Sequence, residues 1–180
     1  MKIPLEKVRG MILYFAKHTD PRFFGKTKLM KLFYFADFSH TKKYGLPITF
    51  DQYKNMEHGP VPTTIYSLVS TAYSDPNESK LGDIIEFENT EGSRIHKIIP
   101  KKEFSNIDRK MFSIAELEIM ANVCQRFSTA NKKIIEDASH KEHPWSDTDF
   151  LDDISYKLAA RDSDSETSEE EIELALKILN

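Results

Sequence analysis

The sequence has 180 residues, 39% of them hydrophobic, and carries 25 basic against 29 acidic side chains, for a net charge of −4. This length favours one domain that buries its own core, and the single cysteine, Cys124, excludes an internal disulfide and is typical of a reducing compartment, here the cytoplasm. No apolar run approaches the roughly 20 residues that cross a bilayer. The charges of Glu6, Lys7 and Arg9 make the first residues unlike a secretory signal, so we expect no membrane partner.

Two helices are predicted near the start of the chain. Pro4 suits the first position of a helix, and apolar residues then recur at helical spacing over residues 4–18. We expect Thr27 to cap the second helix, which runs to about His40. Its apolar residues cover most of the circumference, which is typical of a central, buried helix. Gly45 is placed to end it.

The middle of the chain mixes short strands with helices. Residues 48–53 alternate weakly and predict a short strand, and a helix follows Pro62. Two β-rich arms within residues 84–100, about a central Glu-Gly pair, are typical of a hairpin. Ser113 begins a capping box ahead of an apolar run, which predicts a helix over residues 113–127.

Two further helices are predicted before the acidic tail. One follows Thr129 and runs to Ala138, and the other lies near residues 147–160. Residues 139–145 between them are expected to form a loop.

The end of the chain differs in composition from the rest. Residues 162–171 contain only serine, threonine and acidic residues, which cannot bury a core, so we expect a mobile linker there. A capped amphipathic helix follows and must dock on its own domain or on another molecule. We therefore divide the chain into a domain of residues 1–160 and a segment of residues 161–180.

Together these elements predict a mainly α fold. It is a compact helical domain with a small antiparallel β element, the hairpin, and a C-terminal helix after an acidic linker.

Charge is unevenly spread along the chain. Residues 1–60 hold eleven basic and five acidic side chains, and the remainder holds fourteen and twenty-four. The basic residues of the second helix are interpreted as a solvated face, with a surface for an acidic partner as the alternative: Lys26, Lys28, Lys31, Lys42 and Lys43.

No catalytic motif stands out. The sequence lacks a Gly-rich phosphate loop, a nucleophile elbow and a zinc-protease helix. His58, beside Glu57, is the strongest candidate for a base, but no nucleophile accompanies it. His140 and His143 are spaced to share a metal ion only if they lie on a helix, and Cys124 falls on an apolar helix face. We expect no enzyme and no cofactor, and keep a metal-dependent or histidine-based enzyme as the alternative.

The stretch from His58 to Pro62 predicts a rigid corner. Gly59 can adopt a positive φ, and Pro60 restricts Gly59 to an extended ψ. Val61 is restricted in the same way by Pro62, so the chain runs straight and then enters a helix. This corner needs no catalytic role to explain it.

Three segments carry a resemblance to a known family. They are Lys28 to Ala36, His58 to Val61, and Ser139 to Trp145. In this order they resemble the Panacea, or SocA-like, antitoxin domain, a family often labelled phage-associated. That family shows a Lys-Leu-x-Lys-Leu-x-Tyr-x-Ala helix, a Tyr-Gly-Pro-Val corner and a Thr-His-x-x-x-x-Trp segment. This chain has His58 for the tyrosine and Ser139 for the threonine, and the resemblance covers roughly residues 5–155.

The resemblance implies an antitoxin that neutralises a cognate protein toxin by direct binding. One member is described as an adaptor that delivers its toxin to a cytoplasmic protease, so a protease is a second implied partner. Nucleic-acid binding for autoregulation ranks last, because the net charge is negative and no helix-turn-helix signature is present. The toxin and the oligomeric state stay open. We expect the three segments to converge in one packed body, with these family-motif residues in structural or partner-binding roles: Lys28, Lys31, Leu32, Tyr34, Ala36, His58, Gly59, Pro60, Val61, His140 and Trp145.

Overall fold

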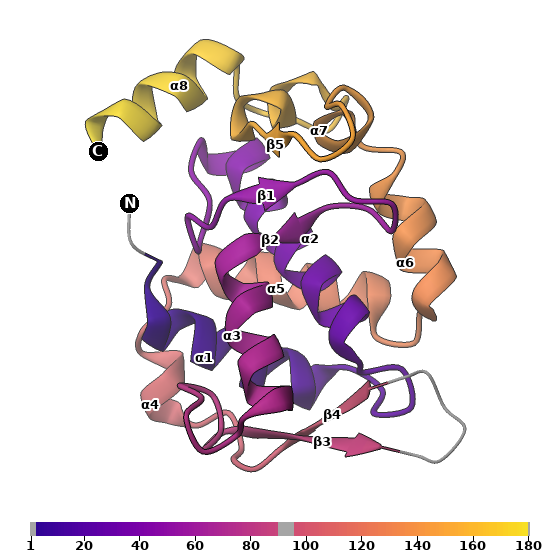
Figure 1. Ribbon diagram of the computed structural model, residues 1–180. Helices are drawn as coiled ribbons and strands as arrows, with labels where there is room; N and C mark the ends of the chain where they lie inside the picture. Colours follow the sequence, from indigo (N-terminus) through magenta and orange to yellow (C-terminus); the bar gives the residue numbers. More distant parts are fainter. Residues whose placement is uncertain (1–2, 90–95, 180) are drawn as a thin grey trace.

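A computed structural model describes residues 3–89 and 96–179 and confirms a mainly helical fold with small antiparallel sheets (Figure 1). The helices are α1 (Leu5–His18), α2 (Lys26–Tyr44), α3 (Thr63–Ser74), α4 (Asn106–Arg109), α5 (Ile114–Phe127), α6 (Lys132–Ser139), α7 (His143–Ser146), the 3₁₀ helix η1 (Tyr156–Arg161) and α8 (Glu169–Ile178). The strands are β1 (Tyr53–Lys54), β2 (Val61–Pro62), β3 (Ile85–Asn89), β4 (His96–Pro100) and β5 (Asp153–Ile154).

Helix α2 crosses the middle of the molecule and carries much of its core (Figure 1). Every residue from Lys28 to Phe38 is buried, because α1, α5, α6 and η1 all pack against this one helix. The expectation of a central, buried helix is therefore confirmed.

The glycine stop predicted for the C-terminal end of α2 is confirmed, but the cap predicted for its N-terminal end is not. Gly45 ends the helix in the left-handed conformation, with a φ of 76°, as expected of a glycine stop. The predicted cap is wrong, because Gly25 rather than Thr27 precedes the helix and no side chain caps it. The helix also reaches Tyr44, beyond the expected end at His40.

A three-stranded sheet joins distant parts of the chain in the order β2-β1-β5. Tyr53 of β1 pairs with Pro62 of β2 on one side and with Ile154 of β5 on the other. The Gly-Pro corner and the segment after α7 are therefore held against the same central strand.

The strand expected over residues 48–53 forms only at its last residue. The backbone N–H groups of Ile48 and Thr49 donate to the carboxylate of Asp37 in α2, at 2.8 Å each. This segment is therefore a loop fastened to α2, because a side chain takes the donors that a neighbouring strand would have used.

The hairpin is confirmed by antiparallel pairing of β3 with β4, from Ile85 opposite Pro100 to Asn89 opposite His96. The Glu-Gly centre predicted for its turn lies outside the described residues. Helix α5 is also confirmed, and Ser113 and Glu116 form the expected capping box.

The prediction of a helix near residues 147–160 is wrong. That segment is a loop, then β5, then η1. Residues 139–145 were expected to be a loop but include the start of the short helix α7, and α6 begins after Asn131 rather than Thr129. Pairing of β5 with β1 and the bonds that Asn55 makes to this segment outweigh its helical pattern.

The acidic segment, expected to be mobile, is bonded to the end of α2. The backbone N–H of Glu166 donates to the carbonyl of Lys42 at 2.9 Å, and the hydroxyl of Thr167 donates to the carbonyl of Thr41 at 3.1 Å. These donors therefore bind carbonyls in the last turn of α2, where the carbonyl of Thr41 also accepts from the N–H of Gly45 at 2.8 Å.

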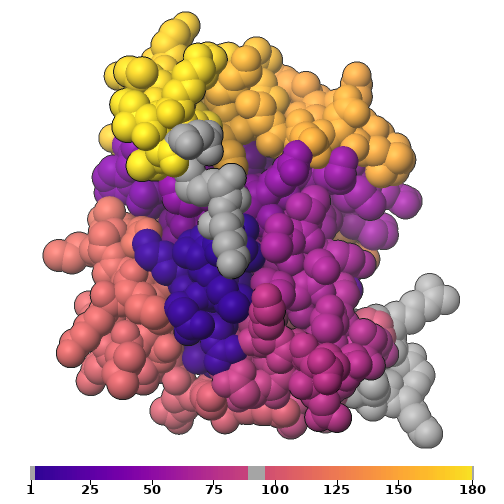
Figure 2. Space-filling view, turned by 60° about the vertical axis from the view of Figure 1, so that its left-hand side comes forward, coloured from indigo at the N-terminus to yellow at the C-terminus, as the bar shows by residue number. Residues whose placement is uncertain are grey.

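Helix α8 docks on the chain's own body. Ile172 is fully buried and belongs to the main core cluster. Figure 2 shows α8, in yellow, lying above the start of α1, in indigo. Within residues 3–89 and 96–179, no helix combines the length and apolar character that a membrane crossing requires.

Replacing Ile172 with alanine is expected to lower the free energy of unfolding by about 2 kcal/mol, because the change leaves a cavity under α8. Ile178 is the matched control, since it lies on the same helix and is 74% exposed. Ile178→Ala is expected to change stability by less than about 0.5 kcal/mol. Denaturant unfolding of both variants checks this, and equal effects would mean that residues 161–180 fold apart from residues 1–160.

Candidate functional site

Buried lysines of α2 fasten other parts of the chain. Nζ of Lys28 donates to the carbonyls of Ser128 and Ala130, at 2.9 and 2.8 Å, where α5 ends. Burial lowers the pKa of Lys28 to about 8. A cation at a helix C-terminus also interacts favourably with the helix dipole. This motif lysine therefore holds the turn between α5 and α6.

Lys31 holds the Gly-Pro corner in the same way. Its Nζ donates to the carbonyl of Pro60 at 2.7 Å, and its side chain is almost completely buried. Burial lowers the pKa of Lys31 to about 7. The first and second family-motif segments thus meet through one buried hydrogen bond.

Gly59 brings the third segment to the same point. It has a φ of 89°, and a Cβ added to it would lie 2.6 Å from Oγ of Ser139 and 3.0 Å from Cε of Lys31. The end of α6, the corner and α2 are therefore packed so closely here that only glycine fits.

Gly59→Ala is expected to lower the free energy of unfolding by about 2–3 kcal/mol, because it adds a steric contact to the cost of a positive φ. Gly45→Ala is the control. Gly45 has a φ of 76°, but its added Cβ would lie 3.9 Å from the nearest atom, Cβ of Ala175. That variant is expected to lose about 1 kcal/mol from φ alone. Chemical denaturation measures both, and equal losses would show that the close packing at Gly59 is unimportant.

His140 and Trp145 cover the outer side of the corner. Their rings stack at 3.9 Å between centroids with 13° between planes. Nε1 of Trp145 donates to the carbonyl of Met56 at 3.4 Å, and Nδ2 of Asn55 donates to the carbonyl of Trp145 at 3.1 Å. Burial, and then the charge of Lys31, lower the pKa of His140. The expected convergence of the three segments is therefore present in the structure.

The remaining motif residues serve the fold or stand on the surface. Leu32, Tyr34 and Ala36 lie in the core, and Val61 pairs with Lys54 in the small sheet. His58 is exposed, and its Nδ1 lies 3.8 Å from Oε1 of Glu136.

The interpretation of the basic residues of α2 as one surface is wrong. Lys28, Lys31 and Lys42 are buried and contact groups of the chain itself. Lys26 is partly buried and donates to the hydroxyl of Ser70 at 2.7 Å. The periodic pattern placed these residues on one helix but could not show that other elements enclose it.

An ion-pair cluster around Lys42 was missed at the sequence level. Nζ of Lys42 lies 3.3 Å from Glu142, 2.9 Å from Asp162 and 3.1 Å from Asp164. Burial opposes its charge, but these carboxylates outweigh burial and raise the pKa of Lys42. In the sequence, only the acidic composition after residue 161 pointed to these ion pairs, and it did not show that Lys42 would be the partner of the acidic residues.

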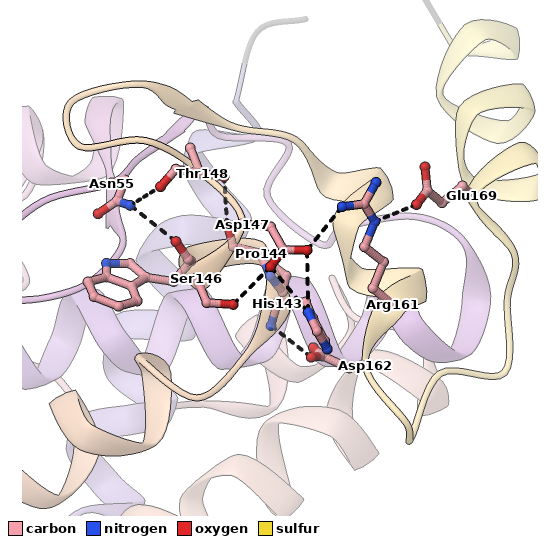
Figure 3. A network of polar contacts seen from close by, with 10 residues as sticks. Asn55, His143, Pro144, Ser146, Asp147, Thr148, Arg161, Asp162 and Glu169 are labelled. Carbon is pink, nitrogen blue, oxygen red and sulfur yellow. Dashed lines mark hydrogen bonds and ion pairs between the residues drawn. The ribbon is translucent and has the colours of Figure 1, made fainter.

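A second polar network continues from this cluster (Figure 3). Arg161 pairs with Asp147 at 3.0 Å and with Glu169 at 2.7 Å, and Asp147 also faces the ring of His143. The backbone N–H of His143 donates to Asp162 at 2.8 Å. These contacts fasten α7, η1 and the start of α8 to one another.

Metal chemistry finds little support in the described ranges. Among residues 3–89 and 96–179, no three His, Cys, Asp or Glu side chains gather as metal ligands would. Cys124 is buried, and burial raises its pKa to about 12, so it stays a thiol in the core.

An open groove of about 1200 Å³ lies between the start of α1, α3, β5 and α8. Its apolar lining includes Leu5, Leu68, Ile154 and Leu176. The motif residues of the corner do not line it.

These features define a class of protein: a mainly helical domain in which buried polar residues hold distant segments of the chain together. The chain belongs to the family of the antitoxin SocA-like, Panacea domain, whose sequence model matches residues 29–146. Comparison with curated proteins and with solved structures gives no match.

Proposed function

We propose that this chain is an antitoxin that neutralises a protein toxin by binding it directly in the cytoplasm. The observation that carries the proposal is the family match over residues 29–146. The structure supports it, because Lys28 and Lys31 bind backbone carbonyls inside the fold and so hold its segments together. A rigid scaffold of this kind suits recognition, since binding then costs little ordering.

The alternative of a histidine-based enzyme has less support. His58 is exposed and faces only Glu136 among ion-pair partners in the described part of the chain. Asp37 is a buried carboxylate, but it accepts hydrogen bonds from the N–H of Thr49 and the hydroxyl of Tyr53. Neither arrangement gives an activated nucleophile.

Co-expression tests the proposal. The gene adjacent to this one is expressed alone and together with this chain, and bacterial growth is followed. The proposal predicts that the neighbour alone stops growth and that this chain restores it. A neighbour that is harmless alone contradicts the proposal, as does toxicity that this chain leaves unchanged.

This chain could neutralise the toxin by blocking it or by delivering it to a protease, and both routes begin with the same complex of the two proteins. The half-life of the toxin separates the two routes, because only delivery shortens it when this chain is present. A shortened half-life that returns to normal in a protease-deficient host supports the adaptor route, and an unchanged half-life supports blocking.

A further inference from the structure

The loop between α7 and β5, residues 147–152, presents two apolar side chains to solvent. Phe150 is 60% exposed and Leu151 is 52% exposed. Met56, on the neighbouring connection after β1, is 36% exposed. Phenylalanine and methionine are enriched in protein interfaces relative to the rest of the surface, so this cluster of exposed side chains suits a binding role.

The loop is held rigidly although it is exposed. Asn55, which is buried, exchanges two backbone hydrogen bonds with it, donating to the carbonyl of Asp152 and accepting from the N–H of Leu151, at 2.9 Å each. Its side chain also donates to the carbonyl of Thr148 at 2.6 Å (Figure 3). A loop fixed before binding loses little freedom when it binds.

Leu151 has a backbone conformation that its side chain does not favour. Its φ is 71°, in the left-handed region that bulky residues rarely adopt. Burial of the side chain does not offset this strain, since Leu151 is half exposed. Hydrogen bonds hold the backbone in this conformation, because the N–H of Leu151 donates to the carbonyl of Asn55 at 2.9 Å and its carbonyl accepts from Nζ of Lys54 at 3.2 Å. Backbone strain that the surrounding structure maintains in this way is common at functional positions.

The charges beside the two apolar residues point to the kind of partner. Asp149 and Asp152 flank them and form no ion pair within the described ranges, and the same holds for Glu57 on the adjacent turn. Asp147 and Asp153 are paired with Arg161 and Lys54 and add no free charge. Lys54 also reaches the carbonyl of Leu151, but its charge is paired with Asp153. The unpaired carboxylates beside the two apolar residues therefore favour a basic partner surface.

The family match ends at residue 146, directly before this loop. The loop thus lies outside the segment that the family model describes, while the motif residues within it build the scaffold that supports the loop. A recognition element of this chain's own is expected at such a place.

We propose that Phe150 and Leu151 form the anchor by which this chain binds its toxin, in an apolar pocket that is bordered by lysine or arginine. This inference rests on the proposed function and adds to it the surface used and the chemistry of the toxin's binding site.

The experiment measures the affinity of the full chain for the purified product of the adjacent gene by calorimetry, together with the melting temperature of each variant. Phe150→Ser and Leu151→Asn are each expected to raise Kd by at least about tenfold. Asparagine tolerates a positive φ, so Leu151→Asn is expected to melt at or above the wild-type temperature. Ile114→Asn is the control, because Ile114 is 86% exposed at the start of α5, and its Kd is expected to match that of the wild type.

Reversing the charge of the acidic residues in the loop tests whether basic residues border the toxin's pocket. Asp149→Lys with Asp152→Lys is expected to weaken binding by on the order of tenfold at low salt, and by less as salt is raised. Glu78→Lys with Glu103→Lys is the matched control, because both glutamates are exposed and lie outside the loop. Its affinity is expected to stay close to that of the wild type.

The outcomes separate the two proposals. If the wild type binds and restores growth but the loop variants bind equally well, the loop inference is wrong and the antitoxin proposal stands. If Leu151→Asn melts below the wild type, Leu151 serves the fold and the inference is also wrong. If the wild type neither binds the neighbour nor restores growth, the proposed function itself fails.

Discussion

Replacing Lys42 with methionine is expected to lower the free energy of unfolding by about 3–5 kcal/mol, because it removes the cation from a buried ion-pair cluster. The side chain of Lys42 is 5% exposed, and those of Glu142 and Asp162 are 12% and 9% exposed. Without the ammonium group, these two carboxylates face each other with little water to screen them. Methionine has a similar length, so the loss of packing is small.

Lys43→Met is the matched control for this change. Lys43 is the next residue, its side chain is 36% exposed, and its ion pair with Glu118 is long, at 3.9 Å. That variant is expected to unfold at nearly the same urea concentration as the wild type, because exposed ion pairs contribute little to stability. Urea denaturation at neutral pH compares the two, and a Lys42 variant that is as stable as the Lys43 variant would contradict the account of the cluster.

Replacing Asp37 with alanine is expected to cost about 4 kcal/mol or more, because it removes the acceptor of several buried hydrogen bonds. Asp37 is fully buried and accepts from the N–H groups of Ile48 and Thr49 and from the hydroxyls of Thr49 and Tyr53. Alanine leaves these donors without partners. Asp37→Asn keeps the shape and one carbonyl oxygen, so it is expected to lose much less.

Stability near Asp37 also depends on pH. Burial raises the pKa of Asp37 from 3.8 to about 6, against the opposing effect of its hydrogen bonds. The folded state then binds more protons than the unfolded state between these two values, so the free energy of unfolding falls as pH rises from about 4 to about 6. Denaturant titrations across this range are expected to show a shallower fall for Asp37→Asn. Identical slopes would contradict the raised pKa.

The sequence predicted what depends on local pattern. Apolar spacing placed α1 and α2, the capping box at Ser113 placed α5, and Gly45 marked the end of α2. The two arms of the hairpin followed from their β-rich composition. These signals lie within a few residues of the features they predict.

The sequence did not predict what depends on long-range contacts. Asp37 holds a segment about eleven residues away as a loop, and Asn55 holds another, about ninety residues away, out of a helix. Lys42 finds its carboxylates beyond residue 140. A polar residue on a helix does not reveal its partner from the sequence, so buried lysines were interpreted as a surface.

Only part of the candidate site was predicted, because its long-range contacts are not visible in the sequence. Resemblance to the family identified the segments that carry Lys31, Gly59 and Trp145, and the structure brings these together. It did not point to Phe150 and Leu151, which lie beyond the family match and within a predicted helix.

The central claim is that this chain acts by forming a physical complex with its toxin. The most direct test mixes the purified chain with the purified product of the adjacent gene and determines the mass of the mixture by size-exclusion chromatography with light scattering. The account predicts one stable species whose mass is that of both proteins together, formed without any cofactor. Restored growth in cells, with two proteins that elute separately and a toxin that is chemically altered, would contradict it.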